Sequence, residues 1–193
     1  MSSIKQSFLD PQGDIKQRNN YYVSIDIGVK NFAYAMFKNG FEIVDFNIIE
    51  LSKDNIINDL IEWFKKLKNF LGSEDFIKCV IIEQQVKNNV KALIIQNIIM
   101  TICTFKDIDY YVFNPKLKFK LMNEVVKLNY KGRKQKSIDY ILMYLNKYNL
   151  IDLKLKFMRF IKKDDVADAL NMGLMYLNGL EPKKIIEFYT FHS

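Results

Sequence analysis

Apolar and polar residues follow two patterns along this chain, which predict five strands and several helices. Short runs rich in β-branched and aromatic residues are typical of strands. Longer stretches in which apolar residues recur every three or four positions are typical of helices. The expected strands cover residues 21–27, 31–38, 41–50, 77–83 and 109–114. The expected helices cover residues 56–71, 88–105, part of 116–128, 137–148 and 164–180, with a loop around Gly132.

The order of these elements predicts an α/β fold. Asn39-Gly40 is a preferred tight-turn sequence, because both turn positions need positive φ, so the first three strands should form an antiparallel meander. The last two strands alternate with helices, as parallel crossovers do. We therefore expect one domain over residues 21–180, a mixed five-stranded sheet with helices on both faces. Residues 1–20 should form a flexible N-terminal arm and residues 181–193 a C-terminal tail.

Composition removes several classes of enzyme. The 193 residues include one histidine, His192, so a serine or cysteine triad, a histidine-ligated zinc site and a histidine general base are excluded. Cys79 and Cys103 lie in apolar runs without metal-site spacing, which indicates buried thiols in a reducing compartment. Residues 1–20 lack an apolar targeting segment, and the apolar run 92–105 is too short to span a membrane. We expect an intracellular protein.

The positive charge is concentrated in one stretch. Residues 115–163 hold 14 Lys/Arg and 3 acidic residues, whereas the rest of the chain holds 15 and 19. Such a stretch favours binding to a polyanion, since each neutralised phosphate releases counterions. A solvated face that keeps the protein soluble is the alternative. The candidate DNA contacts are Lys30, Lys131, Arg133, Lys134, Lys136 and Lys163.

Four carboxylates stand where structure alone does not require them. Asp26 lies within an apolar strand, and Glu83 ends another, at the strand end where α/β proteins gather ligands. Asp165 and Asp168 share one face of the last helix. Structural roles remain open for each, such as pairing of Asp26 with Lys30, pairing of Glu83 with Lys87, and helix capping by Asp164 or Asp165.

Taken together, the four carboxylates indicate a metal centre. If they converged without cations they would repel one another, and two divalent ions would offset that repulsion. Hard oxygen ligands select Mg²⁺ or Mn²⁺. Two such ions about 4 Å apart can activate water and stabilise the leaving oxygen in phosphodiester hydrolysis. The basic stretch would then hold the nucleic-acid backbone.

Three segments of the chain form a recognisable combination: Ile25-Asp26-Ile27-Gly28-Val29-Lys30-Asn31, Ile81-Ile82-Glu83 and Lys163-Asp164-Asp165-Val166-Ala167-Asp168. Together they resemble the viral Holliday-junction resolvases of the RuvC-like branch of the RNase H-like superfamily, with poxviruses as the best match. The resemblance extends over residues 21–180. Bacterial relatives have Asp-Pro-Gly after the first strand, where this chain has Asp-Ile-Gly.

The resemblance implies an RNase H-like fold and a homodimeric, Mg²⁺-dependent endonuclease that cuts four-way DNA junctions symmetrically. It implies that Asp26, Glu83, Asp165 and Asp168 bind two Mg²⁺ ions, with Asp26 bridging them and Mn²⁺ able to substitute. The Asp-x-x-Asp-Ala spacing favours Asp165, and Asp164 stays open as the alternative ligand. A catalytic lysine stays open among Lys131, Lys134, Lys136 and Lys163. The implied role is viral DNA recombination, repair and concatemer resolution in the host cytoplasm, with presence in the virion as a further expectation.

Several alternatives stay open. Because a four-way junction has two equivalent cut sites, a two-fold dimer is expected. Helix 88–105 is the candidate interface, and a core helix covered by its own chain is the other interpretation of its apolar sequence. For function, an RNase H or a flap or fork nuclease of the same fold competes, as does a non-catalytic nucleic-acid-binding module. The chain is too short for the two lobes of a sugar-kinase or actin-like ATPase.

Overall fold

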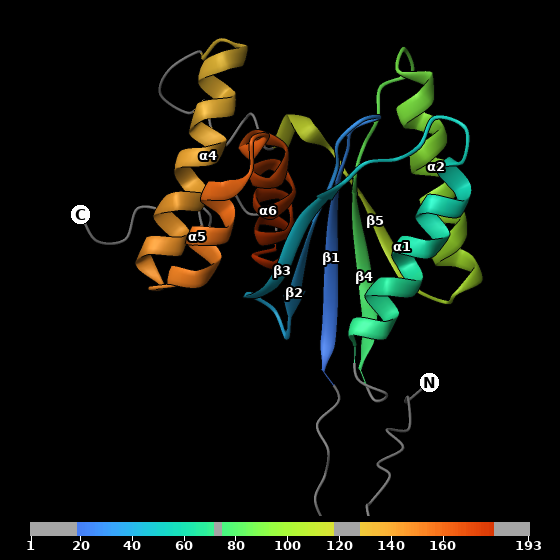
Figure 1. Cartoon of the computed structure of the whole chain (residues 1–193), viewed down its shortest axis with the longest axis horizontal. Coiled ribbons are helices and arrows are strands. Elements are labelled where there is room, and N and C mark those ends of the chain that lie inside the picture. The colour runs from blue at the N-terminus through green and yellow to red at the C-terminus, as the bar shows by residue number, and fades with distance from the viewer. Residues whose placement is uncertain (1–18, 72–74, 118–127, 180–193) are drawn as a thin grey trace, which may run out of the picture.

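A mixed sheet is the frame of the molecule (Figure 1). The computed structural model describes residues 19–71, 75–117 and 128–179, so nearly all of the expected arm and the whole tail lie outside it. The strand order is β3-β2-β1-β4-β5, with β1 and β2 and also β2 and β3 antiparallel, and β1 parallel to β4 and β4 to β5. The strands are β1 Asn20–Ile27, β2 Phe32–Lys38, β3 Glu42–Ile49, β4 Phe76–Glu83 and β5 Asp109–Phe113.

The predicted fold class is confirmed, and the hairpin has the predicted cause. Asn39 and Gly40 have φ values of 47° and 113°, so both adopt the positive φ that the tight turn needs. The parallel strands β4 and β5 are each reached through a helix, as expected for right-handed crossovers. In the part of the chain that the structure describes, no helix has the length and apolar character needed to cross a membrane.

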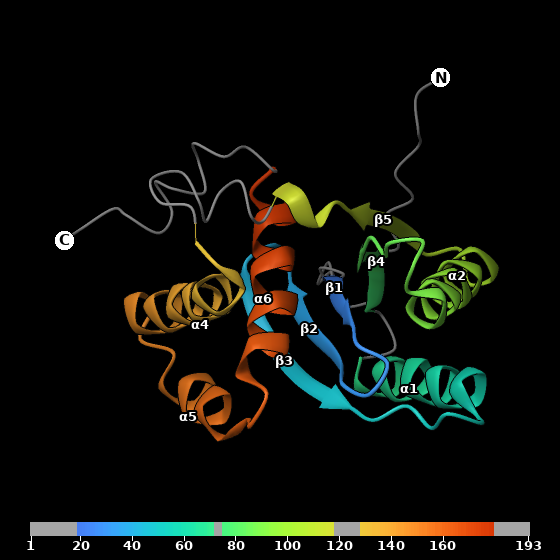
Figure 2. The ribbon, with the colours of Figure 1, turned by 90° about the horizontal axis from the view of Figure 1, so that it is seen from above.

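Helices cover both faces of the sheet (Figure 2). One buried cluster joins Ile25, Ile82 and their neighbours to α1 and α2, and the other joins Ile81 to α4, α5 and α6. Alternate residues of each strand therefore face opposite helical layers. Cys79 and Cys103 are buried free thiols, as predicted. The helices are α1 Ile56–Phe70, α2 Val90–Phe105, α4 Tyr130–Lys147, α5 Ile151–Arg159 and α6 Lys163–Leu177.

The predicted loop around Gly132 is wrong. Residues 131–136 belong to the first turns of α4, because the Asn129 side chain caps this helix by accepting a hydrogen bond from the Gly132 N–H at 2.8 Å. Gly132 therefore lies close to the helix start rather than between two helices. Helix α5 was not predicted. Of the expected helix 116–128, residues 115–117 form a helical turn and residues 118–127 lie outside the described ranges.

Helix α6 approaches the sheet closely at Gly173. A Cβ atom at this position would lie 2.2 Å from Phe37 Cε2 and 2.7 Å from Ser24 Oγ. Ser24 Oγ also donates a hydrogen bond to the Ala169 carbonyl at 2.6 Å. The absence of a side chain at Gly173 lets α6 lie directly across β1 and β2, with its first turns beyond the carboxyl end of β1.

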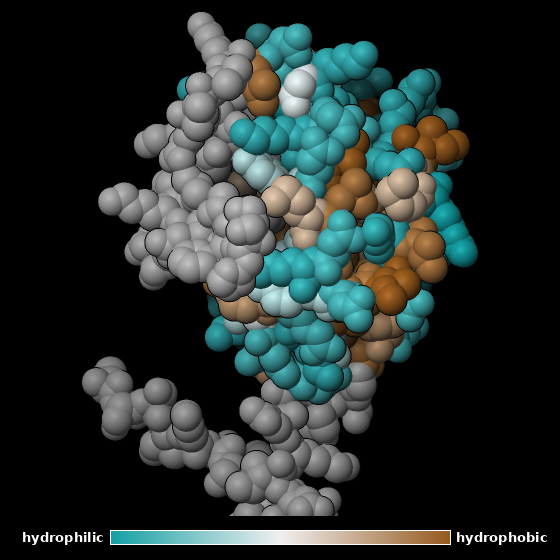
Figure 3. All heavy atoms as spheres, turned by 90° about the vertical axis from the view of Figure 1, so that its left-hand side faces the viewer, coloured by the Kyte–Doolittle hydropathy of each residue, from teal (hydrophilic) through white to brown (hydrophobic). Residues whose placement is uncertain are grey.

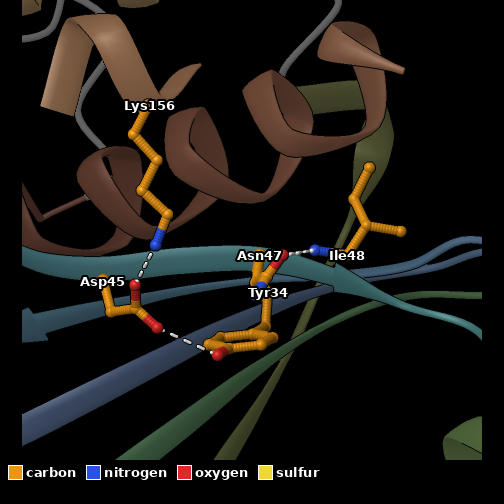
Figure 4. Close-up of polar contacts among 5 residues, drawn as sticks. All are labelled: Tyr34, Asp45, Asn47, Ile48 and Lys156. Carbon is orange, nitrogen blue, oxygen red and sulfur yellow. Dashed lines mark hydrogen bonds and ion pairs between the residues drawn. The ribbon is translucent and has the colours of Figure 1, made fainter. Parts of the chain in front are cut away.

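The open edge of the sheet is tied to α5 through Asp45 of β3 (Figure 4). The Asp45 carboxylate pairs with the Lys156 ammonium and accepts a hydrogen bond from the Tyr34 hydroxyl at 3.0 Å. Burial, followed by the charge of Asp45, raises the pKa of Tyr34 well above its usual value of 10.0. Asp45 thus connects α5 to the second strand of the sheet and holds the α4–α5 pair against it.

Candidate active site

Asp26 and Glu83 lie side by side at one end of the sheet. The last aligned pair of β1 and β4 is Ile25 with Ile82, and both of these side chains face α1 and α2. The next residue of each strand, Asp26 and Glu83, therefore faces the α6 layer. Neighbouring strands are about 4.8 Å apart, so the two half-buried carboxylates can share one ligand.

The chain after Glu83 is held by two glutamines that the sequence analysis missed. Gln85 Nε2 donates to the Glu83 backbone carbonyl at 3.2 Å and to Glu83 Oε2 at 3.3 Å. The Gln85 backbone N–H donates to Gln96 Oε1 at 2.7 Å, and Gln96 is a polar residue of α2 that is buried among apolar ones. A buried amide in an apolar helix is the sequence signal that could have identified this contact.

Asp165 and Asp168 are brought to the same end by α6. Asp165 is half-buried and lies near Asn31, which follows β1. Asp168 accepts a hydrogen bond from Ser137 Oγ of α4 at 2.6 Å. Burial and the neighbouring Asp164 carboxylate raise the pKa of Asp165, against the opposing effects of Lys134 and Asn31. This is the expected condition of a carboxylate held near other acids without a cation.

Asp164 has a different role from Asp165. The predicted capping role is wrong for both residues, since α6 begins at Lys163 with Lys162 at its N-cap and no side-chain cap hydrogen bond. The Asp164 carboxylate instead pairs with the Lys134 ammonium. Burial alone raises the pKa of Asp164, but the hydrogen bond and charge of Lys134 outweigh burial and lower it overall.

Lys134 is the lysine that the structure places against the acidic start of α6. Burial alone lowers its pKa, but Asp164 and Tyr130 outweigh burial and raise the pKa above its usual value. Lys134 is therefore a cation at every physiological pH. Of the other three candidates, Lys131 is exposed, Lys136 lies 5.5 Å from the Tyr140 ring centroid, and Lys163 Nζ donates to the Phe160 carbonyl at 2.8 Å.

The four carboxylates share one end of the fold but do not form a closed ligand shell. Within residues 19–71, 75–117 and 128–179, no three His, Cys, Asp or Glu side chains are grouped closely enough to hold a metal ion. The donor set of Asp26, Glu83, Asp165 and Asp168 offers only carboxylate oxygens, which fit Mg²⁺ or Mn²⁺ and not a soft metal. Cation binding there requires these side chains to turn toward one another.

Four of the six predicted basic residues lie in α4, beside this acidic end: Lys131, Arg133, Lys134 and Lys136. Figure 3 shows that face with many hydrophilic side chains and hydrophobic ones between them. Lys30 and Lys131 are exposed. Arg133 is half-buried, and its guanidinium donates to the Leu128 carbonyl at 3.1 Å. The first turns of α4 therefore present cations beside the helix that carries Asp165 and Asp168.

Comparison with known proteins identifies the family. The family described as Poxvirus A22 protein matches residues 21–181 of the chain. The chain belongs to this family. The A22-family chain is 28% identical over 166 residues to a Holliday junction resolvase of Fowlpox virus (strain NVSL), covering 83% of this chain and 94% of the relative.

Solved structures share the fold of this A22-family chain. The Fowlpox virus resolvase, in complex with substrate Holliday junction DNA, superposes with a TM-score of 0.63 at 24% identity, over 83% of this chain and 98% of that one. Thermus thermophilus RuvC superposes with a TM-score of 0.54 at 11% identity, over 82% and 93%. The expected RuvC-like, RNase H-like architecture is thereby confirmed.

Adjacent substitutions at the start of α6 should have opposite effects on stability. In metal-free protein at pH 7, Asp164→Asn should lower the free energy of unfolding by about 1 kcal/mol, because it removes the partner of Lys134. Asp165→Asn should raise it, because the folded state no longer holds this half-buried carboxylate beside Asp164. Urea denaturation in the presence of a chelator measures both.

The pH dependence of these two variants follows from the directions of the pKa shifts. The stability contributed by Asp164, whose folded pKa is lowered, is present above its unfolded pKa of 3.8 and lost as pH falls through the folded value. Asp165, whose folded pKa is raised, lowers the free energy of unfolding once it is ionised. This destabilisation is absent below pH 3.8, its unfolded pKa, and complete above its folded pKa. Effects of the same sign at pH 7 would contradict these assignments.

Proposed function

We propose that this A22-family protein is a Mg²⁺-dependent endonuclease that resolves four-way DNA junctions. One observation carries the proposal: Asp26 and Glu83 lie at the carboxyl ends of adjacent parallel strands and face α6, which brings Asp165 and Asp168 to the same end beside a basic helix. The Fowlpox virus relative named Holliday junction resolvase supports the choice of substrate. We further propose that the protein acts in viral DNA recombination and concatemer resolution in the host cytoplasm.

In this proposal the acidic residues bind metal ions and the basic residues bind DNA. Asp26, Glu83, Asp165 and Asp168 would hold two Mg²⁺ ions, with Mn²⁺ able to substitute. When bound, the ions supply a water of lowered pKa and stabilise the departing oxygen. Lys134 stays protonated and neutralises negative charge on the phosphate. Lys30, Lys131, Arg133, Lys136 and Lys163 would hold the DNA backbone.

Carboxylate substitutions test the nuclease directly. Asp26→Asn and Asp165→Asn should each reduce Mg²⁺-dependent cutting of a four-way junction at least about 100-fold, because each removes a ligand charge, while junction binding in a chelator persists. Asp109→Asn is the matched control. Asp109 begins β5, at the end of the sheet opposite the proposed site, so this variant should cut at the wild-type rate. Gel assays with both continuous strands labelled measure paired, symmetric nicks.

The same assay separates the competing functions, because the fold does not fix the substrate. Preferential cutting of a fork or flap would indicate a fork or flap nuclease instead of a junction resolvase. Cutting of an RNA–DNA hybrid would indicate an RNase H. Full activity of Asp26→Asn or Asp165→Asn would contradict the metal centre. Junction binding without cutting of any substrate by the wild type would indicate a non-catalytic module.

The salt dependence of binding tests the basic helix. Replacing Lys131 and Lys136 of α4 with Gln should lower the slope of log K against log salt by about 2, since each phosphate contact contributes about 0.9. Lys66→Gln with Lys68→Gln, two exposed lysines of α1 on the other face of the sheet, is the charge-matched control. A slope that both double variants change equally would show that α4 is only a solvated face.

We propose that the outer face of α2 is a homodimer interface. Lys91 is the one charged residue within this helix, and Val90, Ile94 and Phe105 are 60%, 50% and 87% exposed. A hollow of about 400 Å³ lies beside Thr101 and Tyr110. An exposed helix face with so little charge is typical of a surface that a partner covers. A two-fold dimer would present two active sites to the two cut sites of a junction.

A charge placed on α2 should separate the subunits. Ile94→Arg should convert a species of twice the 22.9 kDa chain mass into a monomer in sedimentation velocity, because a buried unpaired guanidinium is costly. Ile57→Arg, at a similarly exposed isoleucine of α1, should leave the mass unchanged. A monomeric wild type, or dissociation by Ile57→Arg alone, would rule out this interface.

A further inference from the structure

A buried polar residue outside the predicted site, Ser137, contacts one of its carboxylates, and a second, Asn171, contacts Ser137. Ser137 of α4 donates from Oγ to Asp168 Oδ1 at 2.6 Å. Asn171 of α6 donates from Nδ2 to Ser137 Oγ at 2.8 Å and to the Ser137 carbonyl at 3.0 Å. Ser137 is 1% exposed and Asn171 is 0% exposed. The three residues form a continuous chain of hydrogen bonds that ends on Asp168.

This chain of hydrogen bonds has a defined direction. The Asn171 amide nitrogen can only donate, so the Ser137 oxygen acts as its acceptor. The single hydroxyl proton of Ser137 is then directed to Asp168. A hydrogen bond to an ionised carboxylate is about twice as strong as a neutral one, and it is stronger still in a buried setting. The Asp168 carboxylate is therefore held at one oxygen in a single orientation.

We propose that Ser137 and Asn171 are positioning residues that orient Asp168 for binding of a divalent cation. This inference rests on the proposed function, in which Asp168 is a metal ligand. Hydrogen-bond partners of ligating carboxylates fix their orientation, and loss of such a partner typically costs 10–100-fold in metal affinity or activity. Burying two polar side chains costs free energy that apolar residues would avoid, which is consistent with a positioning role.

The placement of Ser137 also links DNA binding to the metal ligands. Lys134 and Ser137 are one turn apart on α4, and their partners Asp164 and Asp168 are one turn apart on α6. The helix that carries the DNA-binding cations thus holds a metal ligand directly. A purely structural contact between the two helices is the competing explanation.

Ser24 provides a matched control for that explanation. It is 0% exposed, and its Oγ donates to the Ala169 carbonyl of α6 at 2.6 Å. Ser24→Ala therefore removes a short, buried serine hydrogen bond to the same helix, whereas Ser137→Ala removes the bonds of the Ser137 hydroxyl with Asp168 and Asn171. Only Ser137→Ala removes a bond to a carboxylate of the proposed site.

The test measures Mn²⁺ affinity by calorimetry on the whole chain, alongside the Mg²⁺ midpoint for junction cutting. Ser137→Ala should weaken Mn²⁺ binding and raise the Mg²⁺ midpoint about 10-fold or more, and Ser137→Thr, which keeps the hydroxyl, should recover most of the loss. Asn171→Ala should shift both in the same direction by a smaller factor. Ser24→Ala should lower the melting temperature while leaving the affinity and midpoint at wild-type values.

Wild-type Mn²⁺ affinity in Ser137→Ala, or an equal loss in Ser24→Ala, would overturn the positioning role. Circular dichroism establishes that each variant is folded, and Asn171→Ala tests the same chain from the other end if Ser137→Ala does not fold. Failure of the wild type to cut any junction would instead count against the proposed function. The calorimetric comparison of Ser137→Ala with Ser24→Ala tests the positioning role separately.

Discussion

The close approach of α6 to β1 is the contact on which the acidic end of the molecule depends. Gly173 leaves no side chain between α6 and the Phe37 ring, so the helix lies directly against β1 and β2. With α6 at this distance from the sheet, its first turns lie over the end of β1, and Asp165 lies near Asn31. A helix held farther away could not bring its carboxylates to those of the strands. Packing of an apolar core thus sets the geometry of a polar site.

The same arrangement creates an electrostatic conflict that the protein relieves only in part. Asp164 and Asp165 are neighbours on a half-buried helix start, and Lys134 pairs with the first of them. The pKa of Asp164 is accordingly lowered, while that of Asp165 is raised. Ionised Asp165 therefore destabilises the metal-free fold, as is expected of a carboxylate whose function is to bind a cation. The repulsion between Asp164 and Asp165 also favours a cation nearby, and Lys134 of α4 provides it.

Much of the fold and part of the candidate site could be predicted from local sequence. Strand runs, the Asn39-Gly40 turn and the helical spacing of apolar residues gave the mixed sheet, since these signals act between near neighbours. Asp26 and Glu83 were identified because a carboxylate within an apolar strand or at its end is costly to bury without a partner or a cation. The extent of α4 was missed because its cap, Asn129, outweighed the effect of Gly132. Ser137 and Asn171 were missed because their contact joins residues 34 apart, which no local pattern records.

The central claim is that Asp26, Glu83, Asp165 and Asp168 close around divalent cations at the end of β1 and β4. A crystal structure of the protein grown with Mn²⁺ and recorded at the manganese absorption edge tests it most directly. We expect two anomalous peaks about 4 Å apart among these carboxylates, with Asp26 within ligand distance of both. Saturating Mn²⁺ with no peak there, or peaks held by other residues, would contradict it.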